Sequence, residues 1–170
     1  MIQAQLSHEK ISSSSSDAFS LYEKSRFGEK KENKIIYAPV EALFLAEKNK
    51  ISVFSGKKHI NYENLIRKLK KLDKKIEIKF AVYKDLREKG YIVKSALKFG
   101  AEFRVYEKGF KPGEEHARWI LYTVKETDAL NWHDFAAKNR VAHSTKKNLL
   151  IGIVDEEGDV SYYEISWLRP

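Results

Sequence analysis

An apolar run at residues 149–154, LLIGIV, constrains the fold of this chain more than any other segment. A run of this kind that is closed by a turn is typical of a strand buried within a sheet. The turn spans Asp155 to Gly158, and a strand-like stretch from Val160 to Trp167 follows it. Residues 149–167 therefore predict two neighbouring strands of one sheet.

The segments before this pair favour a sheet with helices around it. Three stretches have the alternating pattern of strands, at Tyr91 to Ala96, Phe103 to Tyr106 and Trp119 to Val124. Thr127 or Asp128 is then a candidate N-cap for a helix that ends near Lys138. We expect the second half of the chain to form a mixed β-sheet flanked by helices.

The first half of the chain alternates between short strand-like and helix-like segments. Strands are predicted at Ile2 to Leu6 and Lys10 to Ile11, as short strands or an edge hairpin, and at Lys34 to Tyr37 and Ile51 to Phe54. Helices are predicted from Asp17 to about Arg26, from Pro39, from Asn61 and from Ile76 to Lys89. The serine run Ser12 to Ser16 is typical of a flexible polar loop.

A change of pattern near Gly90, from helical spacing to alternation, indicates two domains. The predicted division gives a small mixed helix and strand domain at residues 1–76 and a sheet-based domain at residues 77–170. The predicted fold class is therefore α/β, of the α+β type, with two small domains.

The composition removes several kinds of site. The chain has no cysteine and five histidines, and no two histidines have a metal-ligand spacing. Disulfides, a dedicated metal site and a metal cofactor are therefore not expected. No segment approaches the roughly 20 apolar residues of a membrane helix, and no secretory signal is visible, so we expect a cytoplasmic protein. The charged fraction of 33% also fits a thermophilic source.

The formal net charge of +8 favours a polyanionic partner such as nucleic acid. Solvated lysines explain such a charge equally well. Part of it lies on the helix predicted after Asn61, where Arg67, Lys68, Lys70 and Lys71 could touch RNA or simply face solvent.

Cleavage of RNA without a metal needs a base for the 2′-hydroxyl, an acid for the leaving oxygen and a cation for the transition state. Tyr106 ends a predicted strand, His116 ends the glycine-containing loop after it, and Lys147 precedes the buried strand at residues 149–154. Each has an ordinary explanation as well: a packed aromatic, a solvated histidine and a solubilising lysine. Spacing alone does not choose between the two explanations.

Three blocks carry a family resemblance, and they read YKDLREKGYIVKSALKFGAEFRVYEKG, GEEHA and RVAHSTKKNLLIGIVDEEGDVSYYEISWL. They resemble the catalytic C-terminal domain of the archaeal tRNA-splicing endonucleases over Val82 to Pro170, and more loosely around Pro39 to Lys50. The resemblance implies a nuclease-like fold. It also implies that Tyr106 is the general base, His116 the general acid and Lys147 the cation that stabilises the transition state.

Further roles follow from the same resemblance. Lys146 adjoins Lys147 and competes for the role of the cation. A tyrosine base, with an ordinary pKa of about 10, needs cationic neighbours, and Lys147 and Lys108 are the candidates. Arg140 matches an arginine that stacks on a base flipped out of the RNA, so it is the expected RNA-binding residue.

The resemblance implies precursor tRNA with a bulge-helix-bulge as the substrate, and products with a 2′,3′-cyclic phosphate and a 5′-hydroxyl. It also implies that an acidic loop of Asp155, Glu156, Glu157 and Asp159 docks on an opposing subunit. The expected assembly is a homotetramer, or an α2β2 complex with a structural subunit. Two alternatives stay open: a metal-dependent nuclease that uses Glu102 and Asp155, and a non-catalytic RNA-binding subunit.

Overall fold

The computed structural model describes all residues, 1–170, and they form two compact units at residues 1–80 and 81–170. The division falls inside helix α4 (Ile76–Glu88), and the predicted domain boundary after residue 76 stays a prediction. Both units combine helices with a mixed sheet, which confirms the predicted α+β class. None of the helices has the length and apolar character needed to cross a membrane.

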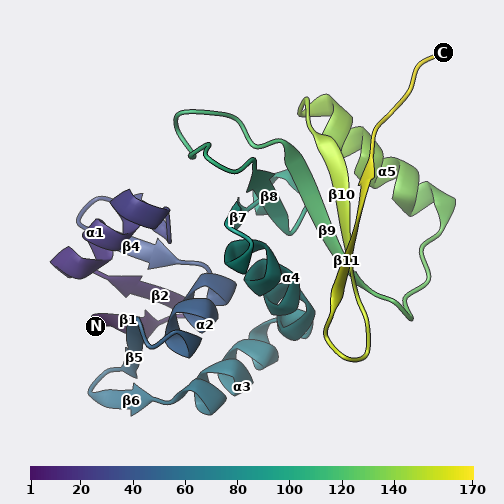
Figure 1. Cartoon of the computed structure of the whole chain (residues 1–170). Coiled ribbons are helices and arrows are strands. Elements are labelled where there is room, and N and C mark those ends of the chain that lie inside the picture. The colour runs from purple at the N-terminus through teal and green to yellow at the C-terminus, as the bar shows by residue number, and fades with distance from the viewer. The chain divides into compact units, whose positions relative to one another are not determined.

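The N-terminal unit is built on a six-stranded sheet in the order β3-β4-β2-β1-β5-β6 (Figure 1). Its strands are β1 (Ile2–Ser7), β2 (Lys10–Ser13), β3 (Glu29–Lys31), β4 (Lys34–Tyr37), β5 (Ile51–Ser55) and β6 (Lys58–Ile60). β1 and β5 pair in parallel, and the other neighbours are antiparallel. β1 and β2 pair as a hairpin, as predicted, but the predicted edge position is wrong, because both strands lie inside the sheet, where Ala4 and Ile11 are buried.

The serine run does not form the predicted flexible loop. Ser13 ends β2, is buried, and donates its hydroxyl to a backbone carbonyl of β1 at 2.6 Å. Ser15 is the N-cap of α1 (Ser16–Ser25) and accepts from the Ala18 amide at 3.3 Å. Serine hydroxyls bond readily to nearby backbone groups, so the run ends a strand and starts a helix. The predicted cap, Asp17, lies one residue inside that helix.

The other helices of this unit are α2 (Pro39–Glu47) and α3 (Tyr62–Leu72). α2 begins at its proline as predicted and is buried along most of its length. Its Glu41 is also buried, and the carboxylate accepts from the backbone amides of Gly28 at 3.0 Å and Ala38 at 2.9 Å. The Gly28 bond joins the start of α2 to the segment before β3, and the Ala38 bond closes the first turn of the helix.

The C-terminal unit contains a five-stranded sheet in the order β11-β10-β9-β8-β7. The strands are β7 (Ile92–Ser95), β8 (Phe103–Tyr106), β9 (Trp119–Lys125), β10 (Asn148–Val154) and β11 (Val160–Ile165), with a short 3-10 helix η1 (Leu97–Phe99) before β8. These strands confirm the predicted ones, with small differences at their ends. β9 and β10 run in parallel and β8 runs against them. β8 therefore ends where β9 and β10 begin.

Helix α4 covers one face of this sheet. Its Val82 packs on Gly152 of β10, where an added Cβ would lie only 3.1 Å from a valine methyl carbon. The Tyr83 ring lies 5.9 Å from the Phe103 ring of β8. A glycine in β10, an interior strand of the sheet, thus allows the helix to approach closely.

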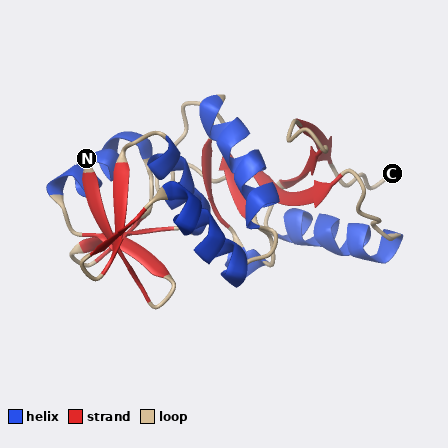
Figure 2. Cartoon of the chain, turned by 90° about the horizontal axis from the view of Figure 1, so that it is seen from below, coloured by secondary structure: helices blue, strands red, loops and turns tan.

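Helix α5 (Trp132–Ser144) covers the opposite face and lies alongside the strands in both views (Figure 1 and Figure 2). It packs on a buried cluster that includes Leu149 of β10. The predicted cap at Thr127 or Asp128 is wrong, because the Asn131 side chain caps the helix by accepting from an amide of its first turn at 2.9 Å. Asp128 instead forms a turn after β9.

Candidate active site

The strand register places Tyr106, Arg118 and Lys147 in one row at an end of the C-terminal sheet. Arg118 donates its amide to the β8 carbonyl next to Tyr106 at 3.0 Å, and its carbonyl accepts from the β10 amide next to Lys147 at 3.0 Å. Neighbouring strands lie about 4.8 Å apart, so the backbones of Tyr106 and Lys147 are on the order of 10 Å apart. Side chains of this length can span such a gap.

Tyr106 and Lys147 both belong to the sheet face that α5 covers. Strand residues two apart point to the same face, and Leu149, two residues after Lys147, belongs to the core under α5. Ile120 belongs to that core and pairs with Arg104, two residues before Tyr106. One end of this face therefore holds the Tyr106 phenol, the Lys147 ammonium and the Arg104 guanidinium.

The two adjacent lysines differ in their surroundings. Lys147 is half-buried, and its ammonium donates to the Thr145 carbonyl at 3.0 Å. Lys146 is exposed and has a left-handed backbone, with φ +55°. The position of Lys147 before β10 directs it to the α5 face, whereas Lys146 is the residue at which the chain turns after the helix.

His116 lies in the loop between β8 and β9, and its side chain is exposed. The turn before it is closed by the Glu114 and Glu115 amides, which both donate to the Lys111 carbonyl at 3.1 Å. No hydrogen bond or ion pair joins His116 to Tyr106 or Lys147. The structure thus brings two of the three expected catalytic residues to one face and leaves the third on the connecting loop.

Side chains hold the stem of this loop. Arg118 forms an ion pair with Glu107 at the other end of the loop. Its guanidinium carbon also lies 4.8 Å from the centre of the Trp119 ring, a cation–π contact. Glu164 of β11 approaches Arg118 to 3.8 Å and accepts from the Trp119 indole N–H. The base of the loop that carries His116 is therefore fixed to three strands.

Arg104 is a site residue that the sequence analysis missed. Burial raises the pKa of the Tyr106 phenol above its usual value, and the positive charge of Arg104 partly opposes this rise. Burial lowers the pKa of the Lys147 ammonium, and Arg104 lowers it further. The predicted neighbour Lys108 instead lies 5.0 Å from the centre of the Tyr91 ring. The alternation of β8, two residues before Tyr106, is the signal that could have identified Arg104.

Arg104→Gln should move the pH profile of cleavage to higher pH. The reaction considered needs Tyr106 deprotonated and Lys147 protonated, and removal of the positive charge raises the pKa of both groups. Any limb of kcat/KM against pH that reports Tyr106 or Lys147 should therefore shift upward, and the rate near neutral pH should fall. Lys125→Gln removes an exposed charge from the same unit and is the control. Unmoved limbs in Arg104→Gln would contradict this electrostatic role.

The expected RNA-binding residue, Arg140, is exposed on α5, about one turn before the end of that helix at Ser144. That end of α5 leads into Lys147 and β10, so Arg140 lies toward the same end of the sheet as the row. Its side chain makes no ion pair or hydrogen bond within the chain. It is free to contact a ligand.

The acidic turn joins β10 to β11, at the end of the sheet opposite to the row of Tyr106 and Lys147. Asp155 is engaged within the turn, since its Oδ1 accepts from the amides of Glu157 and Asp159 at 2.9 Å each. The side chains of Glu156, Glu157 and Asp159 are exposed. Three of the four predicted carboxylates thus face outward, and the fourth shapes the turn.

No three histidine or carboxylate side chains gather closely enough to hold a metal ion. The two carboxylates considered for a metal-dependent nuclease have backbone partners. Glu102 accepts from the Thr123 amide at 3.3 Å, and Asp155 is engaged in its turn.

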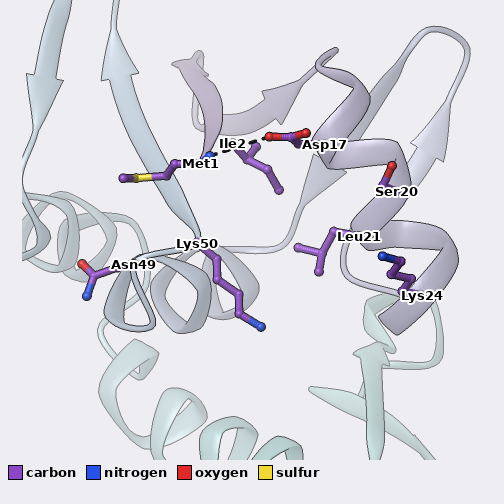
Figure 3. Close-up of a pocket in the computed structure, with 8 residues that line it drawn as sticks. All are labelled: Met1, Ile2, Asp17, Ser20, Leu21, Lys24, Asn49 and Lys50. Atoms are coloured by element: carbon purple, nitrogen blue, oxygen red, sulfur yellow. Dashed lines mark ion pairs between the residues drawn. The ribbon is translucent and has the colours of Figure 1, made fainter.

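A cavity of about 410 Å³ in the N-terminal unit contains none of the expected site residues (Figure 3). Its lining includes Lys24 and Lys50 together with Asp17, whose carboxylate lies 3.7 Å from the Met1 amino group. The Asp17 carboxylate thus already supplies a negative charge beside Lys24 and Lys50.

Two family models match this chain. The one described as tRNA intron endonuclease, catalytic C-terminal domain, matches residues 76–162, and the one described as tRNA intron endonuclease, N-terminal domain, matches residues 2–66. The first contains the positions of Tyr106, His116 and Lys147.

Curated relatives named tRNA-splicing endonuclease are similar to most of the chain. The relative from Thermococcus gammatolerans is 41% identical over 170 residues, which is 99% of each chain. The one from Thermococcus onnurineus is 44% identical over 149 residues, 88% of this chain and 85% of the relative. The one from Nanoarchaeum equitans is 40% identical over 137 residues, 77% of this chain and 88% of the relative.

Proposed function

The chain belongs to the tRNA intron endonuclease family, and on that premise we propose that it excises introns from precursor tRNA by cutting at bulge-helix-bulge boundaries. The net charge of +8 suits an RNA substrate, because RNA is a polyanion. The observation that carries the proposed chemistry is the occurrence of Tyr106 and Lys147 at one end of one sheet face, with Arg104 acting on both.

In the proposed reaction, the ionised Tyr106 phenol removes the proton from the 2′-hydroxyl at the cleavage site. The 2′-oxygen then forms a bond to phosphorus, while the bond from phosphorus to the 5′-oxygen breaks. His116 gives a proton to that 5′-oxygen, and Lys147 opposes the negative charge of the transition state. The products are a 2′,3′-cyclic phosphate and a 5′-hydroxyl, and neither a metal nor another cofactor takes part.

His116 must approach the phosphate from its loop for this scheme to work. Catalytic hydrogen bonds are often long in a free enzyme and shorten in the complex with substrate. The loop follows Tyr106 directly, and the ion pair of Glu107 with Arg118 fixes its stem beside the row. A short movement of the exposed loop onto bound RNA would bring the imidazole to the leaving oxygen.

Arg140 is proposed to stack on a base that leaves the RNA bulge. Guanidinium planes stack well on unpaired bases, and this side chain is exposed without a partner at the site end of α5.

Self-association through the acidic turn is proposed as well. Glu156, Glu157 and Asp159 project from a turn whose shape Asp155 maintains, so three carboxylates can reach a basic surface on another subunit. A homotetramer is the favoured assembly, because one chain supplies both the candidate catalytic residues and the turn. An α2β2 complex with a structural subunit is the alternative assembly.

Incubation of the protein with a bulge-helix-bulge RNA in excess EDTA tests the proposed chemistry. We expect cleavage at both bulges, with 2′,3′-cyclic phosphate and 5′-hydroxyl ends identified by mass spectrometry. A matched RNA with 2′-deoxynucleotides at the two cleavage sites should stay intact, because it lacks the nucleophile. A parallel reaction with Mg²⁺ in place of EDTA separates the alternatives. RNA left uncut in both conditions would favour a non-catalytic RNA-binding subunit, and cleavage only with Mg²⁺, leaving 3′-hydroxyl ends, would favour a metal-dependent nuclease.

A further inference from the structure

A second cavity of the N-terminal unit, of about 370 Å³, has a strongly basic lining. It lies between the β5–β6 hairpin and helix α3. The basic side chains that line it are Lys58, His59, Arg67, Lys68 and Lys71. Its other polar side chains, from Ser55 and Asn64, carry no charge, so no carboxylate contributes to the cavity.

The packing of α3 against the core determines which way its basic side chains point. Arg67, Lys68 and Lys71 are three and four residues apart and so share one face of the helix. Leu65 and Leu69 occupy another face and are each only 1% exposed. Because those leucines anchor the helix in the core, the basic face stays turned toward the β5–β6 hairpin and its Lys58.

Two carboxylates that follow α3 or lie at its end are paired away from this cavity, and Glu63 in the first turn of α3 does not line it. Glu77 pairs with Lys70 at 2.6 Å and Asp73 pairs with Lys79 at 2.7 Å, and none of these four residues lines the cavity. Lys58, Lys68 and Lys71 have no ion pair, and Arg67 donates only to the Asn64 side-chain oxygen at 3.3 Å. Four cations that line one cavity create a positive potential that attracts an anion.

We propose that this basic cavity binds the phosphodiester backbone of an RNA strand. Its ammonium, guanidinium, amide and hydroxyl donors are the groups that bind phosphate oxygens in protein–RNA and protein–DNA complexes. The inference rests on the proposed function, because it takes RNA as the substrate. All residues that line the cavity belong to the N-terminal unit, and Tyr106, His116 and Lys147 are not among them.

An acidic peptide is the other polyanion that could occupy such a cavity. RNA is favoured because the donors on α3 extend from Asn64 to Lys71, about 10 Å at 1.5 Å per residue, and a continuous strand offers several phosphates over that length. The acidic turn of a second copy offers three exposed carboxylates within a single tight turn. Its docking is therefore treated as an outcome that the experiment must detect.

Binding of labelled precursor tRNA across a range of salt concentrations tests the proposal. The parent protein carries His116→Ala so that the RNA remains intact. The cavity variant adds Lys58→Gln, Lys68→Gln and Lys71→Gln, and the matched control adds Lys10→Gln, Lys31→Gln and Lys34→Gln, exposed lysines elsewhere in the same unit. The cavity variant should reduce the slope of log affinity against log salt by about 2 to 3, and weaken binding roughly 10-fold or more, because each phosphate-contacting lysine contributes about 1 to the slope.

The control triple should keep the slope of the parent protein. Equal losses in both triples would mean that net charge alone matters, and no loss in the cavity triple would mean that the cavity does not contact RNA. Either result overturns the proposal. So does a loss of self-association in the cavity triple, measured by sedimentation velocity, because it would assign the cavity to an acidic turn. Failure of the proposed function would appear separately, as uncut RNA with the unmodified protein.

Discussion

Lys147→Met is expected to slow cleavage of a bulge-helix-bulge RNA by about 10²- to 10³-fold, the usual loss when one stabilising group of a transition state is removed. Lys146→Met should cleave at close to the unmodified rate. The two variants lose the same charge one residue apart, but only Lys147 is half-buried on the face that carries Tyr106. A nearby ammonium is most effective where water is partly excluded, because the effective dielectric constant is lower there.

Single-turnover kinetics at saturating protein concentration measure this difference without a contribution from binding. Thermal unfolding of both variants checks that the fold is intact, since Lys147 also donates to the Thr145 carbonyl. Equal losses in the two variants, or a larger loss in Lys146→Met, would transfer the role of the cation away from Lys147.

His116→Ala should slow the same reaction by roughly 10²- to 10⁴-fold, the range typical of a lost general acid, while RNA affinity changes little. His133→Ala is the matched control, because His133 is also exposed but lies near the start of α5, at the other end of that helix. The control should keep the unmodified rate. His116 has no partner in the free chain, so its replacement should leave the thermal stability unchanged.

A change of leaving group separates an acid from a structural residue. In RNA with sulfur in place of the 5′-oxygen at the cleavage site, the departing thiolate needs no proton. The rates of His116→Ala and the unmodified protein should therefore converge on this RNA, although they differ widely on ordinary RNA. A defect of the same size on both substrates would remove His116 from the role of proton donor.

The sequence predicted the strands of the C-terminal sheet well, because burial on both faces gives β10 an apolar run and its neighbours a period of two. It was less successful where one residue type suits several structures. Serines at positions 13 and 15 read as a loop, but in the structure one ends a strand and the other caps a helix. Capping depends on where the chain turns, so Asn131 could not be chosen over Asp128 from residue type alone.

The candidate site was predicted in part. Tyr106, His116 and Lys147 each had an ordinary explanation as single residues, and only the family resemblance joined them. Register is set by the pairing between strands. That Tyr106 and Lys147 lie in one row across the sheet is therefore visible only once the strands are paired. Alternation along β8 puts Arg104 on the face of Tyr106, but its effect on Lys147 depends on the register of β8, β9 and β10 and so could not be predicted.

The parallel pairing of β9 with β10 has a consequence for how far this protein can vary. A slip of a single residue in that pairing would turn Lys147 to the face of α4 and expel Leu149 from the core in the same movement. Errors in aligning the reactive groups are thus also errors of folding. In any chain that has folded correctly, the Lys147 ammonium and the Tyr106 phenol are therefore already on the same face of the sheet.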